Sequence, residues 1–111
     1  MDVRVAWAIE QMSKRIDGDV PVKELADAVN LSVSRFTHLF RAETGMPPAR
    51  YLRQLRMERA RELLDSTFLT VKQVMASVGV NDPSHFAREF RNRHGLPPRE
   101  WRRRPTSAAQ K

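Results

Sequence analysis

Hydrophobic side chains recur every three or four residues along most of the chain, which is the spacing of amphipathic helices. The first stripe, near the N-terminus, consists of Val5, Ile9, Met12 and Ile16 and is widened by Trp7 and Ala8. It predicts a helix over residues 3–16, which the polar stretch Asp17-Gly18-Asp19 ends. A shorter stripe then predicts a second helix over residues 22–29.

The sequence from Phe36 to Tyr51 returns 50 positions later as the sequence from Phe86 to Trp101. The shared positions are Phe36, Phe40, Gly45, Pro47, Pro48 and Tyr51, which match Phe86, Phe90, Gly95, Pro97, Pro98 and Trp101. Upstream the likeness continues at an offset of 49. One residue has therefore been inserted at the polar break between the matched segments, where a turn absorbs extra length. The chain consists of two similar units.

The first unit reads as helix, turn and helix. The helix over 22–29 is followed by a polar turn, and Ser32 can accept a backbone N–H bond at the start of a helix over 33–44. Gly45 supplies a left-handed end for that helix.

The second unit has the same plan with stronger start signals. Thr70 and Gln73 have the spacing of a capping box, so a helix begins at residue 71 and continues until Gly79 breaks it. Asp82-Pro83 then gives a cap followed by a proline at the first helical position, which predicts a helix over 83–94.

A long helix links the two units. Pro47 and Pro48 stop the first unit and start this helix, which runs to about residue 64 and spans ~25 Å at ~1.5 Å per residue. We interpret it as a rigid strut. Most of its arginines are expected to provide solubility and to pair with Glu58 and Glu62.

These elements predict an all-α fold of about seven helices, with two helix-turn-helix subdomains joined by a long linker helix. A short last helix over 98–104 turns Trp101 inward. We expect the first subdomain over 1–47, the linker helix over 48–66, the second subdomain over 67–104 and a disordered tail over 105–111. With so short a chain, most of the helices must share in forming the core.

The third and sixth predicted helices have matching exposed faces. Phe36, Leu39 and Phe40 form the apolar side of the first, and Phe86 and Phe90 that of the second. The opposite faces carry Ser34, Thr37, His38 and Arg41 in the first unit and Ser84, Ala87, Arg88 and Arg91 in the second. Both faces are uncharged at one end and basic at the other, and such side chains can donate to base edges or phosphates. A solvated face without a partner is the alternative.

The net charge of +7 follows the repeat. Residues 1–32 carry −2, residues 33–61 carry +5, residues 62–82 carry −2 and residues 83–111 carry +6. The positive charge is thus concentrated in the second half of each unit, whereas a merely solubilising surface would have no reason to follow the repeat. A polyanionic partner is indicated.

Several kinds of chemistry find no support in the sequence. There is no cysteine, and His38, His85 and His94 are too scattered for a metal site. No catalytic triad, paired carboxylates or glycine-rich phosphate loop stands out, so we expect no enzymatic activity, no metal and no cofactor. No apolar run approaches the ~20 residues of a membrane helix, and the N-terminus lacks a signal peptide, which predicts a cytoplasmic protein.

The two units and their Phe-x3-Phe-Arg-x3-Gly-x-x-Pro endings resemble the DNA-binding domain of the AraC/XylS family of bacterial transcription regulators. The resemblance covers residues 3–104 and is most specific from Val78 to Phe86, which is similar to the family run Val-Gly-Phe-x-Asp-x-Ser-Tyr-Phe. The sequence departs from the family pattern at three positions, where Val80 replaces Phe, His85 replaces Tyr and Met75 replaces a small Ala. These changes affect local packing.

The resemblance implies that helices 33–44 and 83–94 are recognition helices that enter successive major-groove segments. Carried over by position, the implied base contacts are Ser34, Arg35, Thr37, His38, Ser84, His85, Ala87 and Arg88, and the implied phosphate contacts are Arg41 and Arg91. The implied partners are double-stranded promoter DNA and RNA polymerase. Many members of that family join this domain to a separate ligand-binding or dimerisation domain, and none is present here. The sequence is then either a small stand-alone regulator or a fragment of a larger one, and we expect the fragment because the first predicted helix begins right at the N-terminus.

The pattern leaves two other functions open. A non-specific nucleic-acid or RNA-binding helical module could use the same basic faces, whereas two matched recognition helices favour sequence-specific DNA binding. An AraC-like domain also occurs beside alkyl-transfer DNA repair chemistry, which needs a reactive cysteine that this chain lacks. If the first function holds, the two unlike faces predict that one chain covers an asymmetric, bipartite site.

Overall fold

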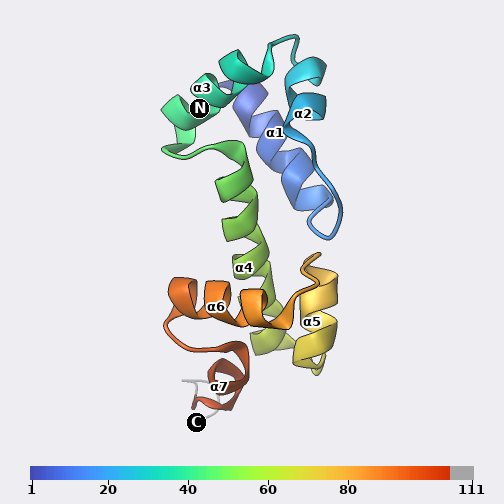
Figure 1. Cartoon of the computed structure of the whole chain (residues 1–111), viewed down its shortest axis with the longest axis vertical. Helices are drawn as coiled ribbons and strands as arrows, with labels where there is room; N and C mark the ends of the chain where they lie inside the picture. The colour runs from blue at the N-terminus through green and yellow to red at the C-terminus, as the bar shows by residue number, and fades with distance from the viewer. Residues whose placement is uncertain (106–111) are drawn as a thin grey trace. The chain divides into compact units, whose positions relative to one another are not determined.

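The computed structural model describes residues 1–105, and every regular element within them is a helix (Figure 1). The elements are α1 (Val3–Lys14), α2 (Val22–Ala28), α3 (Val33–Thr44), α4 (Pro48–Ser66), α5 (Val71–Ser77), α6 (Pro83–His94) and α7 (Pro98–Arg103). The predicted all-α fold is confirmed. The tail expected to be disordered lies, from residue 106, outside the described residues.

The chain divides into two compact units, and the division falls inside α4, between Arg56 and Met57. Each unit has its own core around a pair of phenylalanines. The first core comprises Val5, Ala8, Met12, Val20, Leu25, Ala26, Phe36 and Phe40, and the second comprises Met57, Ala60, Leu64, Val74, Met75, Val78, Phe86 and Phe90. The predicted core phenylalanines are therefore buried in both units. Trp7 is 36% exposed, so the buried face of α1 is narrower than the stripe predicts.

The two cores show that α4 combines two elements of the repeat. Its first turns pack Tyr51, Leu52 and Leu55 against the first core, as α7 packs Trp101 against the second. Its last turns give the second core what α1 gives the first, at a spacing of 52 positions: Val5 and Met57, Ala8 and Ala60, Met12 and Leu64. The length of α4 thus follows from its double role.

Capping groups fix the ends of the helices. The Ser32 hydroxyl accepts from the Arg35 N–H at 3.1 Å, and both bonds of the capping box at Thr70 are formed. Asp82 Oδ1 accepts from the N–H groups of Ser84 at 2.9 Å and His85 at 3.2 Å. Gly45 and Gly95 end α3 and α6 with φ of 84° and 91°, a conformation that favours glycine.

Arginines hold the loop that follows the first helix of each unit. In the first unit, Arg56 donates to the carbonyl oxygens of Ile16 at 2.9 Å and Gly18 at 2.7 Å. In the second, Arg102 donates to the carbonyl oxygens of Thr67 and Leu69. Arg56 is thus an exception among the strut arginines, whereas Arg59 and Arg61 lie 3.7 and 3.6 Å from Glu62 and Glu58 as expected.

We expect that replacing Phe40 or Phe90 by Ala lowers the free energy of unfolding by about 3–5 kcal/mol, because each ring is fully buried. Thermal or urea unfolding measures the change. Phe68→Ala is the matched control, since that ring is fully exposed and its loss should leave the midpoint unchanged. Equal midpoints for all three variants would contradict the assigned cores.

Asp82→Ala removes the acceptor of two backbone N–H groups at the start of α6, and we expect it to cost about 1 kcal/mol of stability. Asp82→Ser keeps a capping oxygen and should recover most of the loss. Denaturant unfolding of the two variants checks this. If Asp82→Ala unfolds at the same denaturant concentration as the wild type, the cap contributes nothing at this position.

Candidate nucleic-acid interface

The helices α3 and α6 turn equivalent sides toward the cores of their own units. From Ser32 to Gln54, every residue is buried, half-buried or exposed in the same way as its counterpart 50 positions later. Phe36 and Phe40 turn one side of α3 into the core, and Phe86 and Phe90 do so for α6. The opposite side of each helix is therefore directed to solvent.

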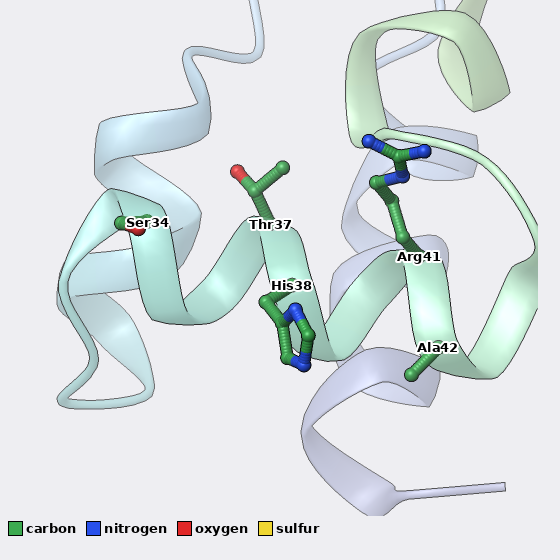
Figure 2. A pocket seen from close by; sticks show the side chains of 5 residues that line it. All are labelled: Ser34, Thr37, His38, Arg41 and Ala42. Atoms are coloured by element: carbon green, nitrogen blue, oxygen red, sulfur yellow. The ribbon is translucent and has the colours of Figure 1, made fainter.

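The outward face of α3 carries a shallow depression of about 510 Å³ lined by Ser34, Thr37, His38, Arg41 and Ala42. Figure 2 shows these side chains in succession along the helix, with the Thr37 hydroxyl, the His38 ring and the Arg41 guanidinium extending well clear of the ribbon. Within residues 1–105 the side chains of His38 and Arg41 form no hydrogen bond or ion pair. Their donors are available to a ligand.

A second depression, of about 370 Å³, adjoins the first and adds Arg35 and Arg4 to the surface around Ser34 and His38. Arg4 comes from α1 and donates to both carboxylate oxygens of Asp2, at 3.1 and 2.8 Å. These bonds lower the pKa of Asp2 to about 2 and raise the pKa of Arg4. Arg4 was not among the predicted site residues, because nothing in its sequence neighbourhood connects it to a helix thirty positions away.

The outward face of α6 repeats that of α3, with Arg88 at the place of His38. Ser84, Arg88 and Arg91 are exposed and Ala87 is half-buried. In the described part of the chain, the guanidinium groups of Arg88 and Arg91 have no partner. The face thus presents two available cations to solvent, and α3 likewise presents Arg35 and Arg41.

His85 is the predicted site residue that departs from this arrangement. Its Nε2 lies 2.8 Å from Oε1 of Glu89, one turn further along α6. Glu89 stands where α3 has Leu39, so the first unit has no equivalent pair. His85 therefore already has a partner within its own helix. Within residues 1–105, His38 and the arginines of the two predicted sets have no side-chain partner.

The third histidine has a packing role. The side chain of His94 is 7% exposed, its ring centroid lies 4.5 Å from that of Phe90, and its Nε2 lies 3.1 Å from the Met57 carbonyl oxygen. Residues 1–105 contain no group of three or more His, Asp or Glu side chains suited to a metal ion. No helix in the same range is long and apolar enough to cross a membrane.

The structure thus brings Ser34, Arg35, Thr37, His38 and Arg41 together on α3, and Ser84, His85, Ala87, Arg88 and Arg91 together on α6. Each set is an exposed helical face edged by hydrogen-bond donors. Such a face suits an extended polyanion. The assignment of individual residues to bases or phosphates is still a prediction.

Comparison with known proteins agrees with this geometry. The family model described as a helix-turn-helix domain matches residues 25–104. The arabinose operon regulatory protein of Escherichia coli K12 is 33% identical over 103 residues, which are 92% of this chain and 35% of that protein. The chain spans between a quarter and about a third of the length of such curated relatives.

Solved structures share the fold. An AraC-type transcriptional regulator from Chromobacterium violaceum is similar with a TM-score of 0.85 and 29% identity, over 91% of this chain and 90% of that one. The DNA-binding domain of AdpA, solved in complex with a target DNA, is similar with a TM-score of 0.83 and 25% identity, over 90% of both chains. This chain therefore belongs to the AraC/XylS-type helix-turn-helix family, whose members are DNA-binding domains of transcription regulators and not an enzyme class.

Proposed function

We propose that this chain binds double-stranded DNA at a specific sequence, with α3 and α6 as its two recognition helices, and so regulates bacterial transcription. One observation carries the proposal: the outward faces of α3 and α6 match in burial, position and sign of charge, although they lie 50 residues apart. The relatives named as transcription regulators, and the similar domain solved with its target DNA, support it.

The side chains on each face suit a major groove. Near the helix starts, Ser34, Thr37, Ser84 and Ala87 are short, which lets the helix axis approach the base edges closely. Further along, the fork of Arg88 fits the O6 and N7 atoms of guanine, and His38 can donate or accept at the equivalent place on α3. We assign Arg41 and Arg91, one turn further on, to phosphates.

The alternative of an RNA-binding module finds less support. The major groove of an RNA duplex is too deep and narrow for side chains to read, and sequence-specific RNA recognition relies on exposed aromatic rings that stack on unpaired bases. On α3 and α6 all four phenylalanines are buried. Their outward faces carry no aromatic residue other than histidine, so they suit a duplex groove better than single strands.

Our proposal extends to the cellular setting. The family suggests a role in which the chain binds promoters in the cytoplasm, without catalysis or a cofactor. RNA polymerase is then a second partner. This chain matches about a third of the length of such relatives, so our proposal concerns this region alone.

Selection of binding sites from random DNA duplexes, using the full chain, tests the proposal. We expect enrichment of one sequence with two unlike half-sites, since Thr37 and His38 on α3 stand where α6 has Ala87 and Arg88. Sedimentation should find one chain per duplex. No enrichment over bulk duplex would support the non-specific module, and a palindrome bound by two chains would contradict the assignment of one half-site to each unit.

Arg88→Ala should weaken binding to the selected site about 5- to 150-fold, corresponding to the ~1–3 kcal/mol of a bidentate guanine contact, and leave affinity for random duplex nearly unchanged. Fluorescence anisotropy with both duplexes measures the two affinities. Arg59→Ala, which removes an exposed α4 arginine near Glu62, is the matched control. Equal losses on both duplexes would identify Arg88 as a phosphate contact.

A further inference from the structure

A groove of about 770 Å³ lies in the second unit, between α5, the start of α6 and α7. Its apolar lining includes Met75, Pro83 and Pro97, and its polar lining includes Lys72, Arg99 and Arg103. Ser84 and Ala87 also line it. The groove therefore adjoins the outward face of α6 and shares two residues with it.

The cations of this groove are available to a ligand. Lys72, Arg99 and Arg103 are exposed, and none of them forms a hydrogen bond or ion pair with another described residue. Glu100 is the one acidic residue of the lining, so the groove carries a positive balance.

The first unit has cations at two of the same places. Lys23 is the repeat counterpart of Lys72, and Arg53 is that of Arg103. Other positions nearby differ in charge between the units, since Arg50 corresponds to Glu100. Lys23 is paired with Asp27 at 2.8 Å, whereas the counterpart of Asp27 in the second unit is Ala76. The second unit therefore keeps the lysine and removes its internal partner, which leaves the cation free for an external anion.

The lining matches one component of DNA. A sugar–phosphate strand alternates phosphates, which bind lysine and arginine, with deoxyribose rings, which pack on apolar surface. When a recognition helix lies in a major groove, the strands that border the groove run alongside it. An acidic protein segment would match the charge as well, but the residues shared with the α6 face favour the DNA strand.

We propose that this groove holds the DNA backbone beside the half-site read by α6, with Lys72, Arg99 and Arg103 contacting its phosphates. The inference rests on the proposed function. It adds a set of contacts that supply affinity and fix the register of α6, and that carry no sequence information of their own.

The salt dependence of binding tests the inference. The logarithm of the binding constant falls linearly with the logarithm of salt concentration, with a slope of about −0.9 per phosphate contact. Lys72→Gln combined with Arg103→Gln should therefore reduce the slope by about two, and weaken binding by the same factor on the selected site and on random duplex. Lys72→Arg combined with Arg103→Lys keeps both charges and should restore most of the slope.

Lys14→Gln combined with Arg59→Gln is the control for net charge, because it also removes two exposed positive charges, which lie near Glu10 and Glu62. Thermal unfolding of each variant checks that the fold is kept. A double variant with the slope of the wild type would overturn the inference, as would a loss confined to the selected site. The slope is also measured on random duplex, so the inference about the groove can be tested even if the wild type prefers no sequence. A wild type without sequence preference would reject the proposed function instead.

Discussion

Burial of two phenylalanines one turn apart is the interaction on which each unit depends. Phe36 and Phe40 lie with ring centroids 5.9 Å apart, and Phe86 and Phe90 lie 6.0 Å apart, each pair tilted by nearly the same angle. Tyr51 and Trp101 meet the second ring of each pair edge-on, at 5.4 and 5.8 Å. A helix held at two successive turns cannot rotate about its axis without exposing a ring. The same packing therefore determines which residues face solvent.

The single helix α4 contributes to the cores of both units. Its first turns close the first unit with Tyr51, and its last turns supply Met57, Ala60 and Leu64 to the second core. Each unit therefore depends on part of α4 to cover one side of its core. Asp65, near its end, accepts from the Trp101 indole at 3.0 Å and from Arg104 at 3.2 Å, so the ring that braces Phe90 is fixed by α4.

Local sequence patterns predicted the elements well. The repeat, the glycines at 45 and 95 and the caps at Ser32, Thr70 and Asp82 act within a few residues, so their effect can be read from the chain alone.

Contacts between distant residues were harder to predict. The half-buried Arg56 donates to backbone carbonyl oxygens about 40 positions away. Because every residue has a backbone carbonyl, the sequence does not indicate which ones accept these bonds. The correspondence of α1 with the end of α4 was missed because, of the three matched core pairs, only Ala8 and Ala60 are identical. The partner of His85 depended on the rotamer of Glu89, which spacing allows but does not determine.

Exchange of one face for the other tests the central claim most directly. Changing Arg35→His, Thr37→Ala and His38→Arg gives α3 the predicted DNA-contacting residues of α6, since Ser34 and Arg41 already match Ser84 and Arg91. The altered positions are exposed or half-buried, so both cores are retained. Repeating the duplex selection with this variant should yield a site whose two half-sites have become alike, with the half-site for α6 unchanged. Selection of the original asymmetric site by the variant would contradict the assignment of α3 and α6 as the helices that read DNA.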